Sequence, residues 1–202
     1  GFCAEANQGA FVGGGKYSRA CGNYSVVLGG LSNTTNGGFS FIGGGGINSI
    51  FPTALCSVLV GGVFNRVCGD ASSVVGGCAN IIQNKSIQSF IGGGKENVSL
   101  SAFSTIGGGC ANQSKTCFVT IGGGHGNLGT GTYSTIAGGF SGIADQLAFV
   151  GGGQINEATD VHAAVVGGYN NKATNTFTFV GGGKSNCASG TCSTATGGFS
   201  SR

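Results

Sequence analysis

The stretch FSTIGGGCANQSKTCFVTIGGGHGN, residues 103–127, contains nearly the same motif twice. In each copy a threonine and an isoleucine precede three glycines, and an asparagine is the third residue after the glycines. A glycine-rich loop that binds phosphate is one explanation of such a motif, and a structural repeat is the other. The two explanations predict different proteins, and the rest of the chain decides between them.

The motif recurs along the whole chain at a nearly constant interval. We number each repeat from position zero, the first glycine of the Gly-Gly pair that lies four residues before the recurrent asparagine. Nine of the twelve intervals between position-zero glycines are 15 residues, and the others are 17, 17 and 14. Such a period is typical of repeat architectures and favours structural corners over a phosphate loop. The position-zero glycines, our predicted corners, are Gly14, Gly29, Gly44, Gly61, Gly76, Gly93, Gly108, Gly123, Gly138, Gly152, Gly167, Gly182 and Gly197.

Other positions of the repeat are as regular as the glycines. Position −2 is aliphatic in twelve repeats and Ala195 in the last, position −4 is small except for Val119, and position +6 is mostly small or aliphatic. Alternate positions on each side of the glycines therefore share one character, which is the period of a β-strand. Asparagine occupies position +4 in ten of the thirteen repeats. These asparagines are Asn33, Asn48, Asn65, Asn80, Asn97, Asn112, Asn127, Asn156, Asn171 and Asn186.

Each repeat is therefore predicted to be one coil of a solenoid: a strand, the Gly-Gly corner, a second strand and a looser corner near position +8. The Gly-Gly corner follows from sterics, because a Cβ would obstruct the backbone angles of a tight turn. The three intervals that differ from 15 residues are explained by changes in the length of the looser corner, since insertions belong in turns. The sequence thus predicts an all-β parallel β-solenoid, or β-roll, of about thirteen coils that forms a single domain over residues 1–202.

The asparagine column predicts a ladder. Stacked coils lie about 4.8 Å apart, so each side-chain amide can bond to the next along the stack and satisfy polar groups that are costly to bury. The alternative is an asparagine in a turn with its side chain in solvent.

A second apolar surface runs along the repeats at positions −5 and −3, which point away from the inner column. A lone solenoid would expose far more apolar surface than a soluble monomer tolerates. A closed homo-oligomer, with three solenoids around an axis, would cover it. The residues expected at this interface are Phe11, Phe39, Phe41, Phe90, Phe103, Phe118, Tyr133, Phe149, Phe177 and Phe179.

Four segments carry a resemblance to known proteins: NYSVVLGG, FSTIGGG, YSTIAGG and TCSTATGG. They resemble the repeats of trimeric autotransporter adhesin heads and, more closely, the Gly-Gly-Gly-x-x-Asn repeats of phage and large-virus fibre proteins. The resemblance covers residues 9–201 and implies a trimeric, left-handed parallel β-roll that serves as a surface fibre or receptor-binding shaft. The chain departs from the adhesin heads in its Gly-Gly-Gly-x-x-Asn corners and many cysteines, and it shows no coiled-coil stalk or membrane anchor.

Composition excludes several classes of protein. Forty-five glycines with a single proline do not match collagen, and a hydrophobic content of 40% does not match a disordered chain. The nine basic residues are scattered singly, so no nucleic-acid partner is expected. No apolar run approaches about 18 residues, so membrane insertion as a helix is not expected.

No enzyme, catalytic residue, cofactor or metal site is expected. The six carboxylates are dispersed, so no acid–base pair can be nominated. GGGKS at residues 181–185 lacks the earlier glycine of a phosphate loop, because that position is Thr178. The chain has no CxxC pair for zinc and too few aspartates for a calcium-binding nonapeptide repeat. His125 and His162 occupy different columns and are expected to be solvated or corner residues.

The nine cysteines define no framework by spacing. Cys187 and Cys192 flank the looser corner of one repeat, which leaves two alternatives, a local disulfide or free thiols.

We expect a structural and adhesive fibre segment, extracellular or on a virion or cell surface, that forms a homotrimer and attaches to a cell-surface glycan or protein receptor. A head-to-tail extracellular filament is an alternative, since the sequence starts and stops inside a repeat without an obvious polar cap. An ice-binding solenoid is another, because Thr105, Thr120 and Thr135 share position −3 in successive coils. A carbohydrate-processing β-helix enzyme is disfavoured by the lack of clustered carboxylates.

Overall fold

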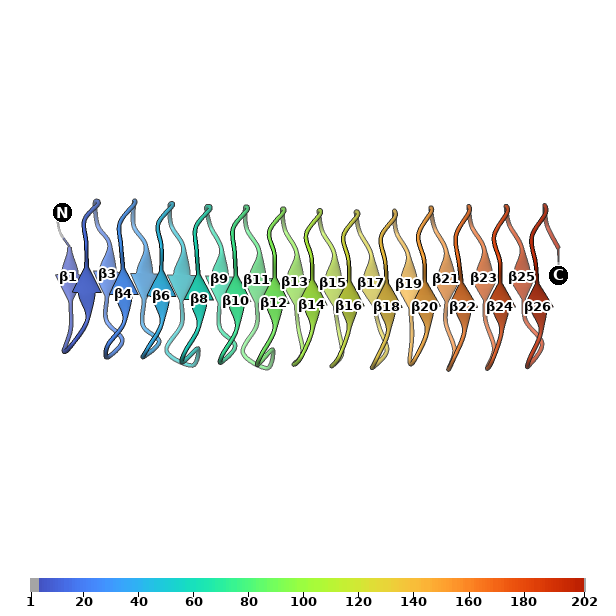
Figure 1. Cartoon of the computed structure of the whole chain (residues 1–202), viewed down its shortest axis with the longest axis horizontal. Helices are drawn as coiled ribbons and strands as arrows, with labels where there is room; N and C mark the ends of the chain where they lie inside the picture. The colour runs from blue at the N-terminus through green and yellow to red at the C-terminus, as the bar shows by residue number, and fades with distance from the viewer. Residues whose placement is uncertain (1–3, 202) are drawn as a thin grey trace. The chain divides into compact units, whose positions relative to one another are not determined.

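The computed structural model describes residues 4–201, which form a parallel β-solenoid of about thirteen coils without helices. The predicted all-β solenoid is therefore confirmed. Every strand is two residues long, and successive strands belong alternately to two sheets. The chain divides into two compact units, with described residues 4–103 and 104–201. Figure 1 shows the two alternating sets of strands, labelled and coloured along the chain.

In the first unit the odd-numbered strands form one sheet, the odd-strand sheet, and the even-numbered strands form the even-strand sheet. The odd-numbered strands are β1 (Glu5–Ala6), β3 (Arg19–Ala20), β5 (Thr34–Thr35), β7 (Ser49–Ile50), β9 (Arg66–Val67), β11 (Ile81–Ile82) and β13 (Val98–Ser99). The even-numbered strands are β2 (Phe11–Val12), β4 (Val26–Val27), β6 (Phe41–Ile42), β8 (Val58–Leu59), β10 (Ser73–Val74) and β12 (Phe90–Ile91).

The second unit repeats this arrangement. Its odd-numbered strands are β15 (Gln113–Ser114), β17 (Leu128–Gly129), β19 (Ile143–Ala144), β21 (Glu157–Ala158), β23 (Lys172–Ala173) and β25 (Cys187–Ala188). Its even-numbered strands are β14 (Thr105–Ile106), β16 (Thr120–Ile121), β18 (Thr135–Ile136), β20 (Phe149–Val150), β22 (Ala164–Val165), β24 (Phe179–Val180) and β26 (Thr194–Ala195).

Coils stack in register even where their lengths differ. Ile42 pairs with Val27 across a 15-residue interval and with Leu59 across a 17-residue interval. The longer coils place their additional residues in an extra turn at the looser corner, at Pro52–Thr53 and Asn84–Lys85. Insertions therefore lie where the off-period intervals predict them, and they leave the strand pairing unchanged.

The core lies between the two sheets and is formed by positions −2 and +6. Ile42 and Leu59 from the even-strand sheet, and Ile50 and Ile82 from the odd-strand sheet, are fully buried. Burial of one such side chain contributes about 1.5–3 kcal/mol to stability. The repetition of these residues in successive coils explains how strands of only two residues are held in place.

The steric need for glycine falls on the second glycine of the corner, at position +1. Gly30 has φ 91°, and a Cβ there would overlap the carbonyl oxygen of Gly45 in the next coil. At the predicted position zero, by contrast, a Cβ at Gly29 would meet no atom within 4 Å. The steric explanation that we gave for the Gly-Gly pair thus applies mainly to its second glycine. Four position-zero glycines have φ between 149° and 155°, and these also favour glycine by backbone angle: Gly93, Gly152, Gly182 and Gly197.

In the first unit the serines at position −4 form a second polar stack from Ser40 to Ser89, which the sequence showed only as a column of small residues. The Ser57 hydroxyl donates to the carbonyl oxygen of Gly69 at 3.1 Å and accepts the N–H of Ser72 at 3.1 Å. Val119, the exception in this column, faces Gly129, where a Cβ would overlap the valine side chain. The core therefore accommodates the larger residue by losing a side chain opposite it.

Candidate functional site

The asparagines at position +4 lie inside the stack, with exposed fractions of 0 or 1%. The Asn48 side-chain N–H groups donate to the carbonyl oxygen of Gly44 at 3.0 Å and to that of Gly62, one coil further, at 2.8 Å. The Oδ1 of Asn48 accepts the N–H of Asn65 at 3.0 Å. One buried side chain thus satisfies two corner carbonyls and one N–H, groups that would be costly to bury without partners.

The bonds of this ladder run mainly from side chain to backbone, whereas we expected bonds between amides. Amide-to-amide bonds join Asn80 to Asn65 and Asn97 to Asn80, each at 3.1 Å, in addition to the backbone bonds. The reason is that the next coil offers its own backbone N–H to each Oδ1. Serine can stand at the same position: the Ser201 hydroxyl donates to the carbonyl oxygen of Gly197 at 3.2 Å.

The residues expected at an oligomer interface fall into two separate rows. Those at position −5 lie at the looser corner with positive φ, as in Phe39 (φ 55°) and Phe118 (φ 59°). Those at position −3 lie on the outer side of the even-strand sheet, as in Phe41 and Phe90. The corner row contains Phe39, Phe103, Phe118, Tyr133 and Phe177, and the sheet row contains Phe11, Phe41, Phe90, Phe149 and Phe179. The single stripe we expected is thus two rows, because the −5 residue already belongs to the turn.

Rings in the corner row stack on their neighbours in the next coil. Phe118 and Tyr133 stack with centroids 4.7 Å apart, and Tyr24 and Phe39 at 5.4 Å. His162 takes a corner position in this row and stacks on Phe177 at 4.9 Å. These rings remain exposed, from 40% of Phe118 to 65% of Phe39, so the stacking does not bury the row.

In the sheet row, phenylalanine at position −3 is accompanied by glycine at position −1. All five phenylalanines of the row follow this rule, and the ring of Phe41 lies 3.3 Å from where a Cβ of Gly43 would be. Where position −3 is smaller, position −1 is larger in some coils, as in Val26 with Leu28, but it is again glycine beside Thr105 and Thr120. The two columns together form an outer apolar face, positions −3 and −1, in which every phenylalanine at position −3 is matched by a glycine at position −1. The sequence contains this signal, and we had not used it.

Carboxylates in the described part of the chain serve local roles. Glu157 pairs with Lys172 at 3.0 Å, and Glu96 pairs with Lys95 at 3.4 Å. Asp70, Asp145 and Asp160 each accept the N–H of the following residue, at 3.1, 2.8 and 2.6 Å. These contacts close turns and bind neighbouring side chains.

The other residues weighed for chemistry occupy repeat positions. The ammonium group of Lys184, in the GGGKS segment, lies 5.6 Å from the ring centroids of both Tyr169 and Phe199. His125 stacks on Phe140 at 5.1 Å. Cys187 and Cys192 are free thiols, with Cys192 exposed. Within residues 4–201, no group of three or more His, Cys, Asp or Glu side chains could hold a metal ion, and no helix is long and apolar enough to cross a membrane.

Comparison with known proteins assigns no family to this chain. No protein-family model matches the chain, and no curated protein matches its sequence.

Proposed function

We propose that this chain is a structural, non-catalytic segment of a surface fibre, and that its copies associate through the outer apolar face as a homotrimer of left-handed rolls. The observation that supports the proposal is the exposed sheet row of phenylalanines at position −3. Phe41 is half-buried, while Phe90 and Phe179 are each 39% exposed on the outer side of the even-strand sheet.

The physical reason is the extent of this face. Contiguous apolar patches beyond a few hundred Å² mark interaction surfaces in soluble proteins. The residues that form it recur in successive coils of each unit, so one copy presents the same pattern many times along its length. Closed symmetric association is the commonest way in which such a face is covered. The number of three and the left-handed winding come from the resemblance to adhesin heads and viral fibres.

The asparagine ladder supports the fibre role. Each coil is joined to the next by bonds such as that between Asn65 and Asn48, in addition to strand pairing. Repeated buried side-chain bonding of this kind is associated with stiff, stable stacks. A stiff segment on a virion or cell surface would position a receptor-binding part, and the receptor class we propose is a cell-surface glycan or protein.

Sedimentation velocity and native mass spectrometry of the purified chain test the proposal. We expect a trimer at micromolar concentrations. A stable, soluble monomer over the same range would overturn the trimer, and an open-ended series of assemblies in electron micrographs would favour the head-to-tail filament instead.

Ice binding is a second candidate because Thr105, Thr120 and Thr135 pair in register across β14, β16 and β18. The next residue in this column is Phe149, so the threonine array ends there. Thermal hysteresis is the discriminating measurement, and its absence in a concentrated solution would remove this candidate.

A further inference from the structure

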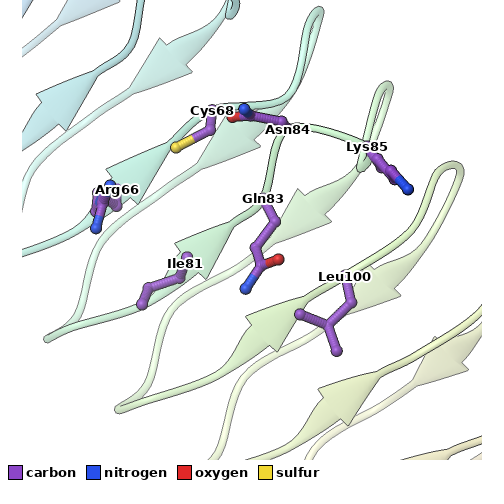
Figure 2. Close-up of a pocket in the computed structure, with 7 residues that line it drawn as sticks. All are labelled: Arg66, Cys68, Ile81, Gln83, Asn84, Lys85 and Leu100. Carbon is purple, nitrogen blue, oxygen red and sulfur yellow. The ribbon is translucent and has the colours of Figure 1, made fainter.

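A hollow of about 470 Å³ lies on the outer side of the odd-strand sheet in the first unit. Figure 2 shows Arg66 and Lys85 at opposite sides of it, with the side chain of Gln83 between them. The volume is within the range of small-molecule sites, roughly 300–1,000 Å³. This surface belongs to the other sheet from the outer apolar face, so what binds here does not depend on the proposed self-association.

The hollow is built by a break in the repeat. The coil between Gly76 and Gly93 is two residues longer than the 15-residue period, and the additional residues form the Asn84–Lys85 turn at the edge of the hollow. Ser86 anchors this turn: it is fully buried, and its hydroxyl donates to the carbonyl oxygen of Ser99 at 2.8 Å. In repeat proteins such insertions are commonly found on a binding face.

The rim of the hollow is positively charged. Neither Arg66 nor Lys85 has a carboxylate within ion-pair distance among residues 4–201. The acidic residues of nearby coils are engaged elsewhere, since Asp70 accepts the N–H of the next residue and Glu96 pairs with Lys95. A second hollow of about 470 Å³, in the other unit, differs in this respect because its Lys172 is paired with Glu157 at 3.0 Å.

Arg66 is held in place by an aromatic ring. The guanidinium carbon lies 4.4 Å from the ring centroid of Phe51, which is in the preceding coil. Stacking of this kind orients the guanidinium plane, and the N–H donors that do not bond to the neighbouring Cys68 thiol can bind a carboxylate or sulfate. Burial raises the pKa of the neighbouring Cys68 thiol, against the opposing effect of the Arg66 charge, so the thiol adds no negative charge at neutral pH.

The rest of the lining is mixed in character. Gln83 and Asn84 supply amide donors and acceptors, and Ile81 and Leu100 supply aliphatic surface. An inorganic anion would use the cations alone and leave the amides and aliphatic groups unoccupied. A sugar ring presents hydroxyl groups to amides and C–H groups to aliphatic side chains, and an acidic sugar adds the anion.

We propose that the hollow beside Arg66 and Lys85 binds an acidic saccharide, a sugar unit that bears a carboxylate or sulfate group. The anionic group pairs with Arg66 and Lys85, the ring hydroxyls bond to Gln83 and Asn84, and the apolar face of the ring lies against Ile81 and Leu100.

The test is a titration of the full chain, followed by NMR or calorimetry, with 3′-sialyllactose and a sulfated N-acetyllactosamine as the acidic probes. Lactose and unsulfated N-acetyllactosamine are the neutral controls. We expect at least one acidic probe to bind at millimolar concentrations or below, and its neutral counterpart to bind at least about tenfold more weakly, since charge-assisted hydrogen bonds are worth about 1.5–3 kcal/mol.

Arg66→Gln and Lys85→Gln should each weaken binding of the acidic probe about tenfold. Lys172→Gln, in the second hollow, is the matched control and should leave the affinity for the acidic probe unchanged. Because Arg66 and Lys85 are exposed, these variants should keep the melting temperature of the parent, which is measured alongside.

Three results would overturn the proposal: no binding of either acidic probe, equal binding of neutral and acidic sugars, or competition by inorganic sulfate at the same affinity as the saccharide. The last result would mean an anion site without saccharide recognition. None of these outcomes bears on the trimer, because sedimentation measures that separately.

Discussion

The backbone N–H of Asn65 donates to the Oδ1 of Asn48 across 3.0 Å, although 17 residues separate the two along the chain. Asn48 makes the same bond to Asn33, at 3.0 Å, across 15 residues. The ladder geometry is therefore independent of coil length, because the additional residues lie at the looser corner. The Gly-Gly corner is constant in every coil and its asparagine in ten of the thirteen, and the outer positions and the looser corner can vary around them.

Replacing a ladder asparagine should destabilise the fold strongly. Asn65→Ala removes the donors to the carbonyl oxygens of Gly61 and Gly77, both at 3.0 Å, and the acceptor for the N–H of Asn80 at 2.9 Å. A buried polar group left without a partner costs about 1–3 kcal/mol. We expect the free energy of unfolding to fall by at least about 3 kcal/mol, as measured by urea denaturation with circular dichroism.

Asn65→Ser is the matched control, since serine at the same position in the last coil keeps a bond to its corner carbonyl. The serine variant should lower the free energy of unfolding by less than the alanine variant does. Equal and small losses for both substitutions would mean that the ladder contributes little to stability.

The two corner glycines should respond differently to alanine. Gly77 has φ 86°, and a Cβ there would overlap the carbonyl oxygen of Gly94 in the next coil. Its neighbour Gly76 has open space where a Cβ would lie. We expect Gly77→Ala to lower the melting temperature severely, since strain at such an angle alone costs about 1–3 kcal/mol, and Gly76→Ala to cost at most about 1 kcal/mol. Similar losses in both variants, measured by thermal denaturation, would contradict the assignment of the steric need to position +1.

The repeat made the architecture predictable. Stacking imposes the same demand on every coil, so buried aliphatic residues such as Ile106 and Ile121, and asparagines such as Asn112 and Asn127, are repeated in the same columns. Repetition within one chain thereby separated constrained positions from variable ones. The number of coils, the strand positions and the location of insertions all followed from this regularity.

Features that depend on backbone angles and side-chain direction could not be predicted in the same way. Glycine occupies both corner positions in every repeat, so the letters alone do not show that Gly30 needs a positive φ and Gly29 does not. Phe39 and Phe41 both appeared to share one face by alternation, but Phe39 has φ 55° and belongs to the turn. The hollow beside Arg66 depends on how one insertion folds, which no column of the repeat describes.

The outer apolar face should govern self-association. Phe41→Ser and Phe90→Ser each remove a ring from the even-strand sheet, and each should raise the dissociation constant of the assembly at least about tenfold, because buried aromatic residues dominate interface energies. Val98→Ser is the control: it removes an apolar side chain from the outer side of β13 in the odd-strand sheet and should leave association unchanged. Sedimentation equilibrium measures all three variants. If Val98→Ser weakens the assembly and the phenylalanine variants do not, the interface lies on the other sheet.

The Cys68 thiol should make stability depend on alkaline pH. Burial raises its pKa above the ordinary value of 9.0, with Arg66 opposing the shift, so the folded state holds this proton more tightly than the unfolded state does. A raised pKa contributes stability that is fully present below the unfolded pKa and is lost as pH rises through the folded value. The melting temperature of the parent should therefore fall more steeply than that of Cys68→Ala, whose overall stability is lower, as the pH rises above about 9. Cys56→Ala is the comparison, because that thiol is exposed at the looser corner and its removal should leave the slope unchanged.

Parallel pH profiles for the parent and Cys68→Ala would show that the Cys68 thiol is not buried as the structure has it. Alkylation of Cys68 as rapid as that of Cys56 would show the same independently.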